Sequence, residues 1–297
     1  MNKTVLITGA GGMLAQKVSN QLKAKGYQVR FLSRNPKSNE QFKWDIEKAY
    51  IDEKAFDNLT HIVHLAGASV GEKKWTKPRK KEIIDSRVET AKLLNKYVLE
   101  KGLNLEAFIS ASGISFYGKD TKDLIVDENS PKGDGFLADV VELWEKAADD
   151  FSKHSKRVVK LRFGVILDKN SGMIQKLAPL FNLGLGSAVG SGKQFLPWVH
   201  AEDACNSVFF AIENEELNGV FNIVAEEAIT NQEFSRAFAK SMKKPFFLPP
   251  VPGFVLKITL GEMAEMVLGG NRVSNLKSLQ NGFTYEFDNI KKALNHI

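Results

Sequence analysis

The residues whose spacing most directly suggests chemistry are the glycines of the segment VLITGAGGMLA, which spans Val5 to Ala15. Gly9, Gly12 and Ala15 follow the pattern Gly-x-x-Gly-x-x-Gly/Ala, between a short apolar run and a stripe of apolar residues with helical spacing. A glycine turn between a strand and a helix presents unpaired N–H groups and the positive helix end to a pyrophosphate. The segment therefore predicts a dinucleotide site, although a tight turn without a ligand is the alternative.

The next informative pair is Ser33, which ends the expected strand 29–33, and Arg34, which follows it. Proteins that prefer NAD usually place an acidic residue about 20 residues beyond the glycines, where it binds the ribose 2′-hydroxyl. A hydroxyl followed by a guanidinium can instead hold a 2′-phosphate through charge-assisted hydrogen bonds. The pair favours NADP(H) as the cofactor, and a solvated arginine in a loop is the alternative.

Further residues that suit a dinucleotide follow the next two expected strands. Asp45 ends the run 42–44 and could accept a hydrogen bond from the adenine amino group. The run 61–65 leads into Ala66 and Gly67, whose small size lets a backbone approach a flat ligand. His61 and His64 fall on opposite faces of that strand and no cysteine cluster accompanies them, so we expect no metal site.

Composition limits the possible partners. The net charge is +6, but the lysines are spread along the chain without interleaved aromatic residues, so nucleic-acid binding is not expected. The single cysteine, Cys205, excludes an internal disulfide. The chain enters its first strand without a signal-peptide pattern, and no apolar run approaches the roughly 18 residues of a membrane span. We expect a cytoplasmic protein without a membrane partner, acting as a monomer or homodimer.

The elements that must position these residues alternate between strands and helices. Strands are expected at 5–7, 29–33, 42–44, 61–65, 108–111 and 158–162, with helices between them. Parallel strands need crossover connections, so the order predicts an α/β fold with a Rossmann-like, doubly wound parallel sheet and a smaller C-terminal α/β lobe. We assign residues 1–165 to the cofactor domain, with returning segments near 195–225, and residues 166–194 and 226–297 to the lobe.

Several ordered segments together resemble the extended short-chain dehydrogenases/reductases. The segments LAGASVGEKKWTKPRKKEIIDSR, ISASGISFYG, FNLGLGSAVGSGKQFLPWVHAEDA and LGGNRV are most similar to the branch called epimerase-family proteins. That branch resembles the NAD-dependent sugar-nucleotide epimerases and has its own small C-terminal domain. The resemblance implies that the cofactor contacts Gly9, Gly12, Met13, Leu14, Ser33, Arg34, Leu65, Ala66, Glu82, Arg87 and Phe163.

The chain departs from the wider superfamily where the reaction takes place. Short-chain dehydrogenases use a serine and then a tyrosine with a lysine four residues later; the lysine lowers the pKa of the tyrosine, which exchanges a proton with the substrate. Phe136 and Val140 stand where the tyrosine and lysine are expected, and neither can transfer a proton. Tyr117 and Ser112 are then the nearest candidates for a catalytic role, with water as the alternative source of the proton.

The substrate end is expected under the loop GLGSAVGSGK, which lacks the spacing of a phosphate loop. The polar candidates that would face the pocket are Lys193, Gln194, Trp198 and His200. These residues favour an NADP(H)-dependent oxidoreductase or epimerase acting on a small substrate. The missing tyrosine–lysine pair favours an alternative function, that of a catalytically degenerate NADP(H)-binding sensor or regulatory protein.

Overall fold

The computed structural model describes residues 3–297 and is built on an eight-stranded sheet. The strand order is β12-β8-β6-β5-β1-β2-β3-β4, and every neighbouring pair is parallel except β3 and β4. The order reverses between β1 and β5, which confirms a doubly wound sheet. The bounds are β1 Thr4–Ile7, β2 Gln28–Ser33, β3 Gln41–Asp45, β4 Tyr50–Ile51, β5 Leu59–His64, β6 Ala107–Gly113, β8 Val158–Phe163 and β12 Gly219–Ile223.

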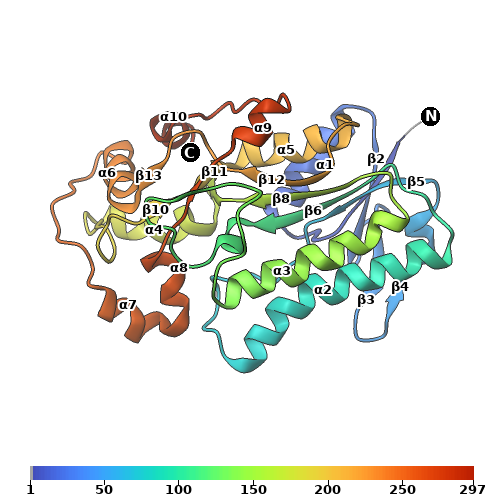
Figure 1. The fold of residues 1–297 in the computed structure, drawn as a ribbon, viewed down its shortest axis with the longest axis horizontal. Helices are drawn as coiled ribbons and strands as arrows, with labels where there is room; N and C mark the ends of the chain where they lie inside the picture. Colours follow the sequence, from blue (N-terminus) through green and yellow to red (C-terminus); the bar gives the residue numbers. More distant parts are fainter. Residues whose placement is uncertain (1–2) are drawn as a thin grey trace.

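Two pairs of helices cover the two faces of this sheet (Figure 1). Helices α1 (Met13–Ala24) and α5 (Ala201–Glu213) lie on one face, and α2 (Lys77–Glu100) and α3 (Phe136–Asp149) lie on the other. Each face has its own apolar core, because the β-strands are buried on both sides. Under α2 and α3, the ring of Phe108 stacks on Phe151 with centroids 3.6 Å apart.

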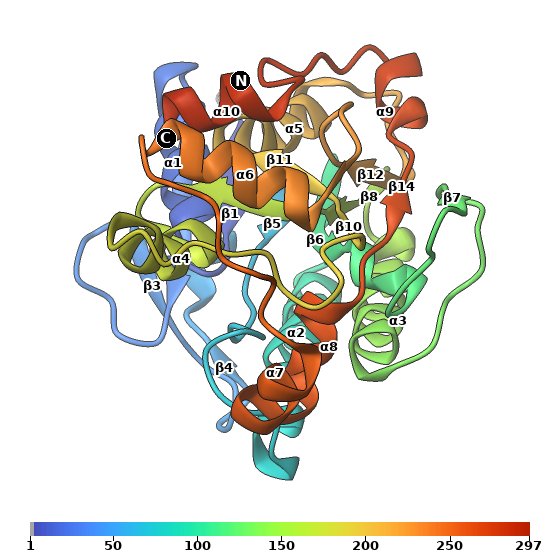
Figure 2. The same cartoon turned by 90° about the vertical axis from the view of Figure 1, so that its left-hand side faces the viewer.

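The remaining segments form the smaller lobe, which Figure 2 views face-on. Two short sheets pair β9 (Val165–Asp168) with β11 (Trp198–His200) and β10 (Phe195–Leu196) with β13 (Ile229–Thr230). Helices α4 (Gly172–Asn182), α6 (Asn231–Ser241) and α10 (Ile290–His296) enclose a third apolar core rich in phenylalanine. Helices α7 (Gly253–Leu260) and α8 (Glu265–Leu268) complete the lobe beside the start of α2.

The return of the chain to the large sheet differs in part from expectation. Strand β12 joins its edge beside β8, as the run near Val220 predicts, but β10 and β11 do not join it. The expectation for residues near 195 is therefore wrong. The chain leaves the sheet at Gly164, where an added Cβ would lie 2.8 Å from the carbonyl oxygen of Pro197, and β11 pairs with the segment beyond that bend.

Short connecting elements tie the lobe to the sheet domain. Strand β14 (Arg272–Val273) pairs with β7 (Ile125–Val126), and α9 (Leu276–Gln280) packs against β12. Single 3₁₀ turns span Glu53–Phe56, Ile114–Tyr117, Asp150–Lys153 and Gly261–Ala264. Within residues 3–297, no helix has the length and apolar character needed to cross a membrane.

Candidate functional site

The glycine turn lies where the strand order reverses, at the carboxyl edge of the sheet. Gly9 has a φ of +78°, and a Cβ there would lie 3.0 Å from the carbonyl oxygen of Leu65. The N–H of Gly12 donates to the Gly9 carbonyl at 2.8 Å, which closes the turn directly before α1. Among residues 3–297, no side chain caps the start of α1, and its first turn carries no acidic residue. The turn therefore offers unshielded N–H groups to an anion.

A threonine–histidine pair holds the two loops of this crevice together. Thr8 Oγ1 accepts hydrogen bonds from the N–H groups of Leu65 and Ala66, both at 3.0 Å. Its own proton is then free to go to Nδ1 of His64, 3.0 Å away, which leaves Nε2–H facing the carbonyl of Arg87. Burial lowers the pKa of His64 to about 4, so the ring is neutral at physiological pH. Sequence reasoning missed this role for Thr8 and His64.

Arg87 shapes the loop that follows β5. Its guanidinium donates to the carbonyls of Ala68 at 3.1 Å and Ile83 at 2.9 Å. A Cβ on Gly67 would lie 2.9 Å from the Arg87 Cζ, so a larger residue there would require the guanidinium to shift. Burial lowers the pKa of Arg87 to about 10, and the group stays charged at neutral pH. Glu82 is exposed and pairs with Arg79 at 2.6 Å.

Two exposed cationic residues are neighbours at the carboxyl end of β2. Arg34 follows β2 and is exposed, and Lys43 lies on β3 in register with Ser33. Lys43 Nζ donates to the backbone carbonyl of Arg34, so the ammonium lies beside the backbone of that residue. Asp45 accepts from the N–H of Lys48 at 3.3 Å in the turn after β3. Lys43 was missed because its proximity to Arg34 depends on strand pairing, which the local sequence does not show.

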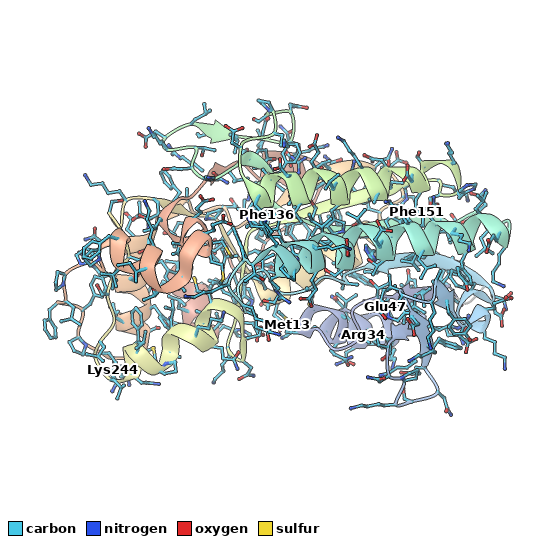
Figure 3. All side chains as sticks on the ribbon, turned by 90° about the horizontal axis from the view of Figure 1, so that it is seen from below. Met13, Arg34, Glu47, Phe136, Phe151 and Lys244 are labelled. Carbon is cyan, nitrogen blue, oxygen red and sulfur yellow. The ribbon has the colours of Figure 1, made fainter. Side chains whose placement is uncertain are left out.

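The remaining predicted cofactor residues also lie at this edge of the sheet. Figure 3 shows Met13, at the start of α1, on the side that faces the lobe, with Arg34 farther along the sheet domain. Leu14 packs against the core beneath α1, and Phe163 is buried at the end of β8. The predicted cofactor residues thus lie at or beside the carboxyl ends of the parallel strands, while their contacts with a cofactor stay predictions.

The predicted catalytic residues, Tyr117 and Ser112, lie in a buried polar network. Ser112 Oγ donates to Glu145 at 2.6 Å, and Glu145 forms two hydrogen bonds of 2.7 Å with Arg162. Arg162 in turn donates to the hydroxyl of Tyr117 at 3.0 Å, and Tyr117 donates to Asn222 at 2.7 Å. Burial raises the pKa of Tyr117 to about 12. Both hydroxyls already bind protein partners, which favours water over Tyr117 as the source of a proton.

An apolar cluster occupies the place of the tyrosine–lysine pair. Phe136, the first residue of α3, packs edge-on against Trp75 with ring centroids 5.1 Å apart. Val140 is buried one turn later beside Ile83 and Met263. Both positions that hold the tyrosine and lysine in short-chain dehydrogenases are therefore hydrocarbon here, and Phe136 is the one of the two that lines the pocket.

The four predicted substrate residues do not line the pocket beside Phe136. Lys193 is exposed, and the amide of Gln194 donates to the carbonyls of Val189 and Val267 at 3.0 and 2.9 Å. Trp198 is buried in the core of the lobe. His200 caps α5 by accepting from the N–H of Glu202 at 3.2 Å, and burial lowers its pKa to about 4. Their substrate role stays a prediction that this placement does not support.

The pocket itself lies between the sheet domain and the lobe and has a volume of about 150 Å³. Phe136 and Trp75 form one wall, and Phe195 and Met266 from the lobe form another. An ion pair of 2.8 Å between Lys119 and Glu265 crosses its rim. Its position at the start of α3 is on the crevice side of the sheet, where the nicotinamide end of a dinucleotide is expected.

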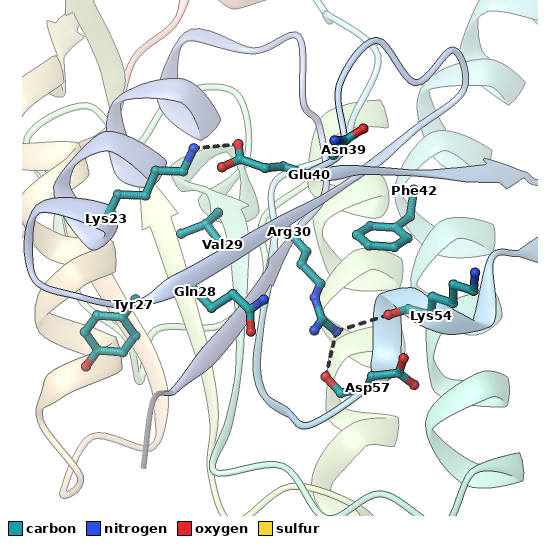
Figure 4. A pocket seen from close by; sticks show the side chains of 10 residues that line it. All are labelled: Lys23, Tyr27, Gln28, Val29, Arg30, Asn39, Glu40, Phe42, Lys54 and Asp57. Atoms are coloured by element: carbon teal, nitrogen blue, oxygen red, sulfur yellow. Dashed lines mark hydrogen bonds and ion pairs between the residues drawn. The ribbon is translucent and has the colours of Figure 1, made fainter.

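A second hollow, of about 380 Å³, lies at the opposite, amino-terminal edge of the sheet (Figure 4). Two of its cations already have partners: Arg30 donates to the carbonyls of Lys54 at 3.1 Å and Asp57 at 2.6 Å, and Lys23 pairs with Glu40 at 2.5 Å. This edge is remote from the carboxyl ends of the strands, where open α/β sheets bind ligands. Within residues 3–297, no cluster of potential metal ligands is present.

Comparison with known proteins agrees with this geometry. The model of the NAD dependent epimerase/dehydratase family matches residues 5–135, and that of a domain of unknown function, DUF1731, matches residues 251–297. Epimerase family protein SDR39U1 of Mus musculus is 33% identical over 99% of this chain and 99% of its own length. The chain belongs to the epimerase family. A second relative, from Mycobacterium leprae, is 32% identical over 98% of this chain and 94% of its own length.

Solved structures of other proteins share the fold of this epimerase-family chain. The crystal structure of human epimerase family protein SDR39U1 (isoform 2) with NADPH has a TM-score of 0.89 and 31% identity, and the match covers 99% of this chain and 98% of that one. UDP-N-acetylglucosamine 4-epimerase from Bacillus cereus has a TM-score of 0.77 at 21% identity, covering 99% and 98% of the two chains. The second likeness extends to the fold alone.

Proposed function

We propose that this protein binds NADP(H) with its pyrophosphate at the start of α1 and its 2′-phosphate between Arg34 and Lys43. The observation that carries the proposal is this pair of exposed cations beside an uncapped glycine turn. The human relative crystallised with NADPH supports the same choice of cofactor. A carboxylate that would repel the 2′-phosphate is absent from the end of β2, where Ser33 and Arg34 stand.

We further propose an oxidoreductase that transfers hydride to a small acceptor without a protonating side chain. Bound NADPH supplies a hydride. The residues around the pocket orient a flat acceptor between Phe136, Trp75 and Phe195 and exclude water from that side. Quinones and conjugated carbonyls suit such a site better than simple ketones, because hydride addition to them does not require simultaneous protonation. The acceptor then takes its proton from water.

The second candidate is a sensor that binds NADP(H) without turning it over. Phe136 and Val140 favour this function, since they replace the two groups that usually handle the proton. Both candidates share the cofactor site and differ only in turnover. Cytoplasmic localisation and a monomeric or homodimeric state remain predictions.

The cofactor proposal is tested by calorimetric titration with NADPH and NADH. We expect NADPH to bind at least about tenfold more tightly, a difference of about 1.4 kcal/mol that one charge-assisted contact can supply. An Arg34→Asp variant should lose or reverse this preference. Lys92→Asp, which reverses an exposed charge on α2, is the matched control and should keep it. Equal affinities in the wild type would refute the proposal.

Turnover is tested by mixing NADPH-loaded protein with quinones, conjugated carbonyls, aldehydes and sugar nucleotides. The nicotinamide absorbance reports oxidation of the cofactor. We expect oxidation with members of the first two groups. If NADPH binds tightly and none of these compounds oxidises it above its background rate, the sensor function replaces the enzyme.

A further inference from the structure

Helix α7 lies at the end of the lobe away from the large sheet and exposes apolar side chains (Figure 1). Five of its eight residues are apolar, yet none of the eight is buried. Phe254 and Ile258, four residues apart on one face, are 66% and 74% exposed, and Lys257 adjoins them on that face. Large apolar side chains that gather in solvent indicate a contact surface.

More exposed apolar residues lie beside the connection that leads into α7. A Cβ on Gly184, just after α4, would lie 3.6 Å from the ring of Pro245. Farther along, Ser187 Oγ donates to the carbonyl of Pro249 at 2.6 Å, so the segment after α4 runs beside residues 245–251 (Figure 2). Four large side chains of these two segments are between 50% and 74% exposed. The outer surface of the lobe therefore consists of Leu180, Leu183, Leu185, Phe247, Phe254 and Ile258.

The charges of these segments have one sign. Residues 169–201 and 234–261, which include α4, α7 and most of α6, contain no aspartate or glutamate. Their cations are all exposed, and there are eight of them: Lys169, Lys176, Lys193, Arg236, Lys240, Lys243, Lys244 and Lys257. The whole chain has 41 cations against 35 carboxylates, and without these eight it has 33 against 35. The positive excess of the protein therefore comes from this part of the lobe.

The charge of these eight cations is not neutralised by the protein. Within residues 3–297, none of them takes part in an ion pair. The carboxylates that flank the second segment are engaged elsewhere, since Glu233 caps α6 and Glu262 pairs with Lys80. Figure 3 shows Lys244 at the far end of the lobe, away from Met13 and the glycine turn. This charge is therefore available to a partner other than the cofactor.

The combination of apolar and cationic side chains limits the kind of partner. A second copy of this chain would bring two surfaces of like charge together, which is unfavourable. A nucleic acid would attract the cations, but it binds through phosphates and base stacking, which exposed leucine and isoleucine side chains do not use. A bilayer with anionic lipids offers acyl chains to the apolar residues and phosphates to the lysines. The bilayer is the partner that matches both features.

We propose that the outer surface of the lobe docks on membranes that contain anionic lipids. Phe254 and Ile258 enter the boundary between headgroups and acyl chains, and Lys257 on the same face contacts the lipid phosphates. Such docking needs no membrane-spanning helix, and it amends the expectation, drawn from hydropathy, that the protein has no membrane partner. The inference does not rest on the proposed function, because no residue of the cofactor site takes part in it.

The test is flotation of the full chain with lipid vesicles, in the absence of NADPH. We expect binding to phosphatidylcholine vesicles with about one third phosphatidylglycerol, and binding at least about tenfold weaker to pure phosphatidylcholine. Salt should weaken the binding, because it screens the lysines. The double variant Phe254→Ser/Ile258→Ser should bind the anionic vesicles at least about tenfold more weakly, because it loses buried apolar area. Lys243→Glu/Lys244→Glu should have an effect of similar size.

Matched controls change the same kinds of residue on other parts of the surface. Leu99→Ser/Leu124→Ser replaces two exposed leucines outside the lobe. Lys25→Glu/Lys153→Glu lowers the net charge by the same amount as the lysine variant of the lobe, at two exposed positions of the sheet domain. Both controls should bind anionic vesicles as the wild type does.

Each outcome decides the inference. If the wild type does not bind the anionic vesicles, the inference is overturned without requiring any variant to fold. Equal losses in the lobe variants and their controls would show adsorption through net charge and would also overturn it. Tighter binding to duplex DNA than to the vesicles, or a homodimer that Phe254→Ser/Ile258→Ser abolishes, would assign the surface to another partner. Failure of NADPH to bind refutes the proposed function instead, because the flotation is run without cofactor.

Discussion

The pocket wall near Phe136 is apolar, whereas the buried network of Ser112, Glu145, Arg162 and Tyr117 is polar. The wall presents Phe136, and Val140 is buried behind it; neither side chain carries a proton to transfer. The network behind it is rich in ionisable and hydroxyl groups, but its members bind one another: Ser112 to Glu145, Glu145 to Arg162, and Arg162 to Tyr117. Polar groups suited to acid–base work are therefore present in the chain, yet they are turned toward the sheet and already paired.

The comparison shows that a polar side chain can serve either catalysis or the stability of the core, depending on where it lies. A hydroxyl contributes to catalysis only if it reaches the reacting atoms, whereas a hydroxyl with protein partners on both sides contributes to the stability of the core. Tyr117 follows Ile114 and Ser115, which line the pocket, but its own side chain is not among the lining groups. We infer that Tyr117 and Ser112 support the fold around the pocket, and that the proton comes from water.

Removing one member of the buried ion pair should have the largest effect. Arg162→Met would leave Glu145 charged and nearly buried without its partner, so we expect the free energy of unfolding to fall by about 3–5 kcal/mol. The measurement is urea denaturation. Lys156→Met, which breaks an exposed pair with Glu106, is the control and should cost at most about 1 kcal/mol. Equal effects of the two variants would contradict a structural role for the network.

Protonation of His64 at acid pH should lower the free energy of unfolding. Its pKa is about 4 in the folded protein and 6.5 ordinarily, so the unfolded chain takes up the proton first. The stability contributed by the neutral ring is present above pH 6.5 and is lost as the pH falls toward 4, by an amount of about 3 kcal/mol. Denaturation across this pH range should show a steeper loss than in His64→Gln. Parallel pH profiles would exclude His64 as the cause.

Tyr117→Phe should have the smallest effect. Loss of the hydroxyl removes one hydrogen bond to Asn222 and one from Arg162, which we expect to lower stability by about 1–3 kcal/mol. Turnover at saturating NADPH should stay within about tenfold of the wild type, because the hydroxyl does not reach the acceptor. A loss of about 10² to 10⁴ in rate with unchanged NADPH affinity would instead identify Tyr117 as a general acid.

Sequence reasoning located the elements that local patterns determine, while the cofactor contacts of their residues stay predictions. The turn at Gly9 and Gly12 and the cation at Arg34 follow directly from a strand, its glycines and the next strand. It was less informative where distant segments meet. Nothing local to Lys43 shows that β3 lies beside β2, and nothing local to Asn271 shows that it reaches Gly118. Trp198 and His200 are residue types that are common in binding sites, but both side chains are buried in the lobe.

The account is tested most directly by single-turnover oxidation of bound NADPH by two acceptors of similar size, a quinone and a saturated cyclic ketone. Stopped-flow absorbance of the nicotinamide gives both rates at saturating acceptor. Because Phe136 and Val140 replace the tyrosine and lysine that supply a proton in short-chain dehydrogenases, we expect the quinone to react at least about 10²-fold faster, the smallest contribution typical of a positioned general acid. A ketone reduced as fast as the quinone would show that the pocket contains such an acid and would contradict the account.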